Sequence, residues 1–160
     1  MTDLRVGIGY DAHAFEEGVP LVLGGVSFEH PHGLAGHSDG DVVAHALIDA
    51  VLGAANLGDI GSLFPSGDEQ YRGASSLDLL WEAYREVREA GWELVNADCV
   101  LVAEEPRIGD VREEMRERLS GAMGLDPDVV SVRATTTDRL GFTGRGEGLA
   151  AHAVALLRRA

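Results

Sequence analysis

Residues 39–54, Asp39-Gly-Asp-Val-Val-Ala-His45-Ala-Leu-Ile-Asp49-Ala-Val-Leu-Gly-Ala54, predict one long apolar helix from about Asp41 to Ala54. Asp39 and Asp41 stand where this helix begins, and acidic side chains suit the positive end of a helix dipole. His45 lies one turn inside the helix, and Asp41 and Asp49 lie four residues to either side of it on the same helix face. We expect Asp49 to accept a hydrogen bond from the His45 imidazole and to orient the ring.

Strand and helix patterns alternate on both sides of this helix. Short alternating or β-branched apolar runs predict strands, and the spacing of apolar residues at three and four predicts helices. The run from Leu149 to Leu157 is ambiguous, because its alanines favour a helix while its length suits a buried strand. The other elements expected are a strand over 4–10, a strand pair or bent strand over 20–28 broken at Gly24-Gly25, a helix from an N-cap at Ser76 to residue 90, a strand over 92–103, a helix over 110–123 and a strand over 129–135, with loops up to about residue 41 and over 58–73.

The fold class expected from this order is α/β (α+β), one domain over residues 1–160 in which about three helices pack on a mixed sheet. The chain has 160 residues, of which 45% are hydrophobic, and this is enough for a single core. The single cysteine, Cys99, allows no disulfide within the chain and lies in an apolar run typical of a buried strand.

The formal net charge is -14, and all 13 basic residues are arginine. A surface this negative repels nucleic acid and anionic membranes, so we expect neither as a partner. The sequence has neither a leader pattern at its start nor an apolar run of the roughly 18 residues that a membrane span needs, which predicts a cytoplasmic protein. An acidic protein that binds phosphates must hold its cations locally, as metal ions or a few placed arginines.

The segment Tyr10-Asp11-Ala12-His13 follows the first predicted strand. Residues two apart in an extended chain point to the same side, so Asp11 and His13 can face one point. A carboxylate and an imidazole suit zinc or manganese, and His45 would add a third ligand. Taken singly, these residues are also compatible with a capped strand end and with a histidine satisfied on a half-buried helix. Three ligands with an open fourth position indicate a catalytic metal site.

Two further segments are rich in polar residues. The run Ala134-Thr-Thr-Thr-Asp-Arg-Leu-Gly-Phe-Thr-Gly-Arg145-Gly-Glu-Gly148 combines hydroxyls, arginines and glycines, and this combination can cradle phosphate oxygens. A turn-rich loop without a ligand is the alternative interpretation. The stretch from Leu57 to Asp68 places carboxylates in a loop that could wall a polyol substrate.

Four motifs together resemble one enzyme family. Tyr-Asp-x-His at 10–13, His-Ser-Asp-Gly-Asp at 37–41 with a histidine four residues on, Leu-Gly-Asp-Ile-Gly-x-Leu-Phe-Pro at 57–65 and the run at 134–148 are similar to those of 2-C-methyl-D-erythritol 2,4-cyclodiphosphate synthase. They are ordered along nearly the whole chain, and the last is long and specific.

This resemblance implies a phosphorus–oxygen lyase of the non-mevalonate route to isoprenoids. Such an enzyme converts 4-diphosphocytidyl-2-C-methyl-D-erythritol 2-phosphate into the cyclic 2,4-diphosphate and releases CMP. It implies a homotrimer with active sites between subunits, a zinc (or manganese) ion and a Mg²⁺ that bridges the substrate diphosphate. It also settles the last segment as a strand.

The resemblance also assigns roles to individual residues. Asp11, His13 and His45 would bind the metal, and His37 and Thr136 would stabilise the transition state. Asp138 would contact Mg²⁺. The residues expected to contact the methylerythritol and phosphates are Asp11, Ala12, His13, His37, Ser38, Asp59, Ile60, Gly61, Phe64, Pro65, Ser66, Gly67 and Asp68. The cytidine pocket, expected from the neighbouring subunit, would be formed by Ala103, Glu104, Glu105, Pro106, Arg107, Ile108, Gly109, Thr135, Thr136 and Thr137. Asp138, Phe142 and Arg145 are also counted among the expected substrate contacts.

The sequence departs from the family pattern at a few positions. Asp138 replaces a frequent Glu, Arg107 replaces a frequent Lys, and Ser66-Gly67 stand where acidic and hydroxyl residues are common. Family trimers have an apolar channel on the threefold axis that is proposed to bind an isoprenoid diphosphate. Phe142 and Arg145 match its lining, whereas His152 stands where an acid can occur.

Two other classes of function remain to be weighed. A metal-dependent phosphohydrolase would release inorganic phosphate, but no second carboxylate-rich cluster or clear general base accompanies Asp11, His13 and His45. A non-catalytic partner protein that keeps the fold and binds an isoprenoid diphosphate would not need these ligands, and all three are present.

Overall fold

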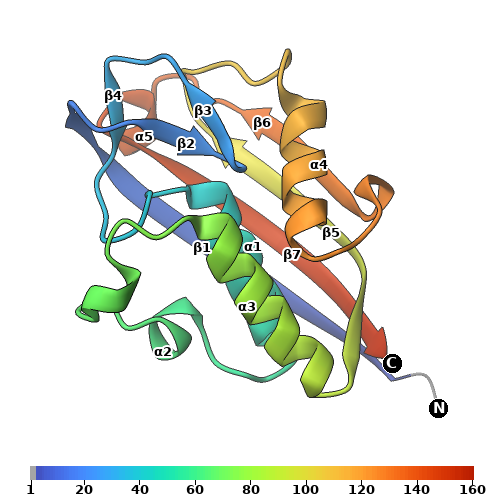
Figure 1. Ribbon diagram of the computed structural model, residues 1–160. Helices are drawn as coiled ribbons and strands as arrows, with labels where there is room; N and C mark the ends of the chain where they lie inside the picture. The colour runs from blue at the N-terminus through green and yellow to red at the C-terminus, as the bar shows by residue number, and fades with distance from the viewer. Residues whose placement is uncertain (1–2) are drawn as a thin grey trace.

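A computed structural model describes residues 3–160 as a five-stranded mixed sheet whose helices lie in front of one face (Figure 1). The strand order is β4-β1-β7-β5-β6, in which β5 and β6 are parallel and every other neighbouring pair is antiparallel. A separate hairpin is formed by β2 and β3. The strands are β1 (Leu4–Glu17), β2 (Leu21–Leu23), β3 (Val26–Phe28), β4 (His32–Leu34), β5 (Trp92–Val102), β6 (Val130–Thr135) and β7 (Gly148–Arg159).

Three longer helices cover the sheet, as the sequence predicted. They are α1 (Val42–Ala54), α3 (Ser76–Glu89) and α4 (Arg112–Ala122). Two helices of a single turn, α2 and α5, lie in loops. The short elements are α2 (Ile60–Leu63), α5 (Gly141–Gly144) and 3-10 turns at Glu69–Tyr71 and Pro127–Val129.

Helix α1 is buried on nearly all sides, because the sheet lies on one side of it and α3 on another (Figure 1). Odd-numbered residues of β1 face this helix, and two of them are glycines. A Cβ atom at Gly7 would come within 2.0 Å of the Ala50 carbonyl oxygen, and one at Gly9 within 1.8 Å of the Ala46 carbonyl oxygen. Only glycine allows so close an approach between a strand and a helix.

The alanines of β7 serve the same contact. Ala151, Ala153 and Ala155 are at most 1% exposed in the middle of the sheet, between β1 and β5. Their small side chains leave room for α1, so the demand for close packing accounts for an alanine content that on propensity alone favours a helix. The strand expected from the family resemblance is confirmed for residues 149–157.

The buried carboxylate of Asp41 joins the start of α1 to the β2–β3 hairpin. It accepts hydrogen bonds from the N–H groups of Val43 and Ala44 in the first helical turn, each at 3.1 Å. It also accepts from Gly24 at 2.9 Å and Gly25 at 2.8 Å. Burial raises the pKa of Asp41 to about 6, and the backbone donors oppose that rise. Asp41 is therefore committed to the scaffold and is not available to His45.

Several boundaries differ from the sequence-based expectation. Strand β1 does not end at Tyr10 but runs to Glu17, because it pairs with β7 as far as Ala14 and then with β4. The loop expected before Asp41 contains β4, and the loop expected over 58–73 contains α2 and a 3-10 turn. Ser76 is not an N-cap. Ser75 holds that position, and Ser76 begins the helix with a fully buried side chain.

Cys99 lies in β5 as expected and is fully buried. Burial raises the pKa of its thiol to about 12, so no thiolate forms at neutral pH.

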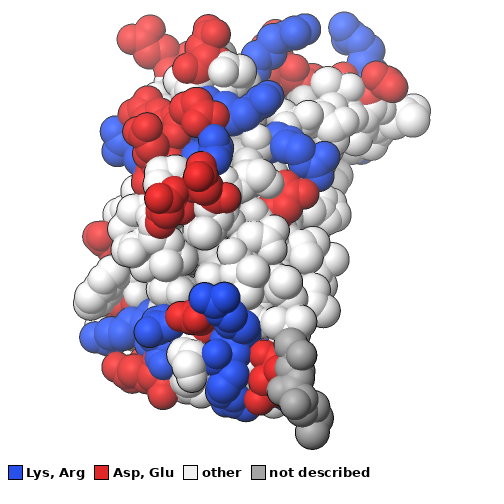
Figure 2. Space-filling model, turned by 90° about the vertical axis from the view of Figure 1, so that its right-hand side faces the viewer, with Lys and Arg blue, Asp and Glu red and all other residues white. Residues whose placement is uncertain are grey.

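The sheet face away from the helices carries exposed apolar side chains. Val6 is 70% exposed, Ile8 71%, Tyr10 51% and Val154 45%, on the neighbouring strands β1 and β7. On the side of the molecule next to this face, the right-hand side of Figure 1, uncharged surface covers the middle and charged residues of both signs gather toward the two ends (Figure 2).

We predict that Gly9→Ala destabilises the protein by about 1–3 kcal/mol or more, because the added methyl group forces β1 away from α1. The matched control is Gly121→Ala in α4, where a Cβ meets nothing within 4 Å. That change should stabilise the helix by up to about 1 kcal/mol. Urea unfolding of both variants measures the difference, and equal effects of the two substitutions would contradict the close packing of α1 on β1.

Candidate metal centre

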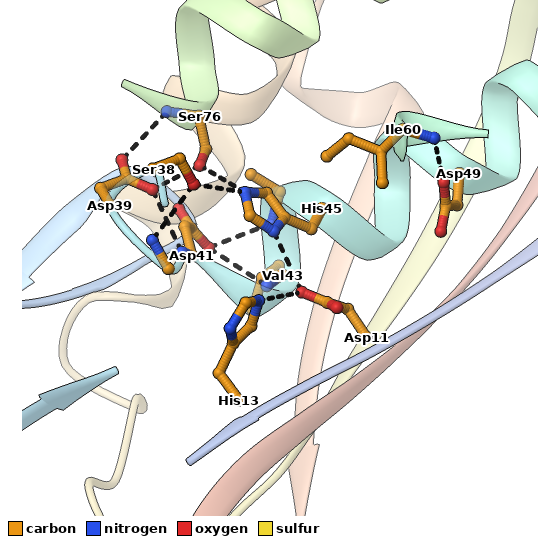
Figure 3. A network of polar contacts seen from close by, with 12 residues as sticks. Asp11, His13, Ser38, Asp39, Asp41, Val43, His45, Asp49, Ile60 and Ser76 are labelled. Atoms are coloured by element: carbon orange, nitrogen blue, oxygen red, sulfur yellow. Dashed lines mark hydrogen bonds and ion pairs between the residues drawn. The ribbon is translucent and has the colours of Figure 1, made fainter. Parts of the chain in front are cut away.

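Asp11, His13 and His45 converge on one point between β1 and α1 (Figure 3). The Oδ2 atom of Asp11 lies 2.9 Å from His13 Nε2 and 3.1 Å from His45 Nδ1. Asp11 and His13 share the strand face of Gly7 and Gly9, which explains why both point at α1. The convergence expected from the sequence is confirmed, although the two strand residues lie within β1 and not at its end.

The ring of His13 is oriented by the backbone. Its Nδ1 lies 2.6 Å from the Ala35 carbonyl oxygen, which can only accept a hydrogen bond, so Nδ1 carries the proton. In the neutral ring, Nε2 then presents a lone pair to the Asp11 carboxylate, and this buried atom makes no hydrogen bond. Two lone pairs at this distance repel unless a cation lies between them. The donor set, one carboxylate and two imidazoles, fits a divalent metal ion.

Protons compete for the same site. The contact with Asp11 raises the pKa of His13 above its usual value, although burial opposes the rise. Burial raises the pKa of Asp11, but its contacts with His13 and His45 together bring it below the usual value. Metal binding must therefore displace a proton over part of the neutral range.

The expected hydrogen bond from His45 to Asp49 is wrong. Asp49 Oδ1 accepts instead from the Ile60 N–H, at 2.8 Å. Side chains on a helix lean toward its N-terminus, so the ring of His45 reaches away from the residue one turn further on. Figure 3 shows Asp49 pointing to Ile60 on the opposite side from the cluster. Asp49 thus holds the 59–61 segment, and burial raises its pKa while the Ile60 N–H opposes this.

The loop before α1 carries two predicted substrate contacts, Ser38 beside the cluster and His37 beside the 64–68 loop. Ser38 Oγ lies 3.0 Å from His45 Nε2. His37 Nε2 donates to the Asp68 carbonyl oxygen at 2.7 Å, which ties His37 to the 64–68 loop. The structure therefore joins the predicted catalytic His37 to the loop expected to contact the methylerythritol.

The other residues predicted to contact the methylerythritol, in the segment 59–67, differ in what they do in the structure. Asp59 is the N-cap of α2 and accepts from Ser62 N–H at 2.8 Å. Phe64 is 6% exposed and packs edge-on against Tyr71, so its side chain supports the loop. Ser66 and Gly67 are exposed.

A separate pocket of about 440 Å³ opens between the end of β5 and the end of β6. Most residues predicted for the cytidine pocket line it. Those in the lining are Ala103, Glu104, Pro106, Arg107, Ile108, Gly109, Thr135 and Thr136, with Asp110, Arg112 and Ala134 in addition. Over residues 3–160, this lining and the metal cluster share no member. One chain therefore presents the two halves of the predicted site apart.

Glu104 orders the threonine loop at the rim of this pocket. Its carboxylate accepts from Thr137 N–H at 3.3 Å and from Arg139 N–H at 3.0 Å. Asp138 and Arg139 adopt positive φ angles of 51° and 68°, which turns the chain back after the threonines. This turn brings Thr136 Oγ1 within 3.2 Å of Asp138 Oδ1, so the predicted catalytic threonine and the predicted Mg²⁺ contact are neighbours.

Arg145 is less free than the sequence suggested. Its guanidinium is paired with the Glu147 carboxylate, two residues on. Phe142 in the same segment is 38% exposed and Leu140 is 73% exposed. The motif thus ends in an exposed apolar turn beside an ion pair.

Fold and site together define an α/β protein with a separate loop-walled pocket and a cluster of two histidines and one carboxylate that could hold a metal ion. Within residues 3–160, no helix has the length and apolar character needed to cross a membrane. The YgbB family model matches residues 4–158, and the chain belongs to this family.

Curated relatives and solved structures agree with this assignment. The chain is 57% identical over 163 residues to the 2-C-methyl-D-erythritol 2,4-cyclodiphosphate synthase of Rubrobacter xylanophilus, covering 100% of this chain and 98% of the relative. A solved 2C-methyl-D-erythritol-2,4-cyclodiphosphate synthase in its CDP-bound form is 41% identical, with a TM-score of 0.86 over 96% of this chain and 99% of that chain. The bifunctional IspDF of Campylobacter jejuni is 44% identical with a TM-score of 0.96, and there the chain covers 43% of the longer protein.

We predict that the protein binds one divalent cation per chain and that His45→Ala weakens binding by more than the roughly 10- to 100-fold typical of losing an outer contact. His30→Ala is the control, because His30 packs against Phe15 and His32 away from the cluster. Zinc content and competition titrations with a chelating dye measure the effect. Unaltered zinc affinity in the His45 variant would overturn the ligand assignment.

We also predict that zinc affinity falls as pH is lowered. Because the pKa of His13 is raised, its ring holds a proton at a pH where an ordinary histidine is already neutral, and only the neutral ring binds metal. Calorimetric titrations at about pH 6, 7 and 8 in two buffers give the affinity and the number of protons released. An affinity independent of pH across this range would contradict the predicted competition.

Proposed function

We propose that this protein converts 4-diphosphocytidyl-2-C-methyl-D-erythritol 2-phosphate into 2-C-methyl-D-erythritol 2,4-cyclodiphosphate and releases CMP. The observation that carries the proposal is the cluster of Asp11, His13 and His45, in which a buried imidazole nitrogen faces a carboxylate with no hydrogen bond of its own. The names of the relatives give the product, 2-C-methyl-D-erythritol 2,4-cyclodiphosphate. The enzyme is then a phosphorus–oxygen lyase of isoprenoid precursor synthesis.

The reaction needs positioning more than it needs a protein nucleophile. The 2-phosphate of the substrate attacks its own β-phosphorus, a new P–O bond forms, and the bond to CMP breaks. Attacker and target share one molecule, so the protein must bend the substrate and stabilise charge in the transition state. Asp11, His13 and His45 would hold a divalent cation, which would supply Lewis acidity toward the substrate phosphates.

The chain's own residues hold the two ends of the substrate. Ser38 borders the cluster and His37 borders the 64–68 loop, and we assign both to the substrate phosphates. Thr136 offers a hydroxyl at the pocket between β5 and β6, with Asp138 beside it as the proposed contact for Mg²⁺. We assign the cytidine to this pocket, since a related synthase has been solved with CDP bound.

The active site is proposed to form between subunits of a homotrimer. The support is twofold: the metal cluster and the pocket are separate within one chain, and the sheet face of β1 and β7 exposes Val6, Ile8 and Val154. Packing these faces around a threefold axis would bury the apolar side chains. Phe142, Arg145 and His152 are the residues we assign to the axial channel. An isoprenoid diphosphate there stays a prediction.

We take zinc as the resident metal and Mg²⁺ as the ion that accompanies the diphosphate. Imidazole nitrogens favour zinc, whereas phosphate and carboxylate oxygens favour magnesium. The acidic surface, with its net charge of -14, makes these two cations the main positive charges available to the substrate phosphates.

We predict that incubation with the cytidyl substrate yields CMP and a cyclic diphosphate, and that a chelator stops the reaction until zinc and Mg²⁺ are returned. Phosphorus NMR separates these products from inorganic phosphate. Release of inorganic phosphate in place of the cyclic product would favour a phosphohydrolase and sink the proposal.

We further predict that two inactive variants restore activity when their subunits are mixed. His45→Ala removes the metal half and Arg107→Ala weakens the pocket half, so exchange of subunits recreates intact sites at about a quarter of the interfaces in a random mixture. Each variant kept alone is the control. No recovery after proven subunit exchange would contradict a site shared between chains.

A further inference from the structure

The second ring nitrogen of His45 faces two hydrogen-bonded side chains, those of Ser76 and Asp39. His45 Nε2 lies 2.8 Å from Ser76 Oγ, the hydroxyl at the start of α3. Ser76 Oγ in turn donates to the Asp39 carboxylate. Figure 3 shows Ser76 and Asp39 grouped on the opposite side of His45 from Asp11. This is the position in which the sequence had suggested Asp49.

The number of hydrogens available fixes which group donates in each of these hydrogen bonds. The Asp39 carboxylate accepts three hydrogen bonds, from Asp41 N–H at 3.1 Å, from Ser76 N–H at 3.0 Å and from the Ser76 hydroxyl. An ionised carboxylate has no hydrogen to give, so the single hydroxyl hydrogen of Ser76 is committed to Asp39. Ser76 Oγ can then only accept from His45, and this contact forms a hydrogen bond only when the ring carries a proton on Nε2.

A proton on Nε2 leaves Nδ1 bare, and Nδ1 is the nitrogen 3.1 Å from Asp11 Oδ2. Without Ser76 and Asp39, the Asp11 carboxylate would favour the proton on Nδ1, and the nitrogen that faces the cluster would then be blocked. Ser76 and Asp39 offer the competing acceptor. In His13 it is Nε2 that stays open toward the cluster, because Nδ1 donates its proton in a hydrogen bond to the Ala35 carbonyl oxygen.

Ser38 cannot substitute fully for Ser76. Its Oγ lies 3.0 Å from the same Nε2, but no carboxylate fixes the direction of its hydroxyl. Once Ser76 Oγ is removed, Ser38 is free to donate to a bare Nε2, which favours the proton on Nδ1. Ser76 is also 0% exposed, and because a buried hydroxyl is costly without hydrogen bonds, its contacts with Asp39 and His45 are needed for stability.

We propose that Ser76 and Asp39 are positioning residues that hold the His45 proton on Nε2 and thereby keep Nδ1 open for the metal. The hydrogen bond between them also links the starts of two helices, since Asp39 precedes α1 and Ser76 begins α3. The inference rests on the proposed metal chemistry of this site, but the position of the proton can be measured without metal or turnover.

The test compares Ser76→Ala with Ser75→Ala, an adjacent and exposed serine whose side chain caps nothing. Nitrogen NMR of metal-free protein, at a pH where the His45 ring is neutral, gives the share of protons on each nitrogen. Zinc competition titrations give the affinity. We expect Ser76→Ala to shift the proton toward Nδ1 and to weaken zinc binding by about 10- to 100-fold, as for other outer contacts of metal ligands. Ser75→Ala should leave both within about twofold of the unmodified protein.

Equal behaviour of the two variants would overturn the proposal. So would a loss of zinc affinity in Ser76→Ala with no shift of the proton, because the hydroxyl would then act only through helix structure. Circular dichroism and melting temperature establish that both variants are folded. If the unmodified protein bound no divalent metal, the proposed function would fail, while the NMR comparison would still decide where the His45 proton lies.

Discussion

The close approach of α1 to β1 is the contact on which the site depends. Gly7 and Gly9 let the helix backbone rest on the strand, and a side chain at either position would collide with a carbonyl oxygen of α1. The next two residues on that strand face are Asp11 and His13. The same contact that fills the core therefore brings His45 to a carboxylate and a second imidazole, within 3.1 Å of Asp11 Oδ2. Stability and chemistry share one set of atoms here, so the packing cannot loosen without moving the ligands.

Around this contact, one buried and two half-buried aspartates hold the loops in place. Asp41 links the β2–β3 hairpin to α1, Asp39 links α1 to α3, and Asp49 links α1 to the 59–61 segment. A buried carboxylate is costly unless backbone N–H groups meet it, and each of these accepts at least one. The loops that carry Ser38 and Ile60 are thus fixed to the helix that carries His45. Preorganisation of this kind lets a site stabilise charge without rearranging during the reaction.

Much of the site could be predicted from the sequence, because period-two spacing places Asp11 and His13 on one side and the helix pattern places His45. The three long helices and the β2–β3 pair follow from the same reasoning. The predicted hydrogen bond from His45 to Asp49 was wrong, because sequence spacing alone does not include the tilt of side chains toward the helix N-terminus. Ser76 was missed because serine before an apolar run predicts a cap, and only the fold brings Asp39 beside it. Strand β1 was predicted too short, since its second half gains its partners from residues far along the chain.

The proposed site binds one cation through one oxygen and two imidazole nitrogens from β1 and α1. X-ray absorption spectroscopy of the zinc-loaded protein tests this most directly. We expect a four-coordinate zinc with two histidine rings, a carboxylate oxygen and one exchangeable oxygen, at distances of about 2.0–2.2 Å. A sulfur neighbour, or a zinc with fewer than two imidazoles, would contradict it.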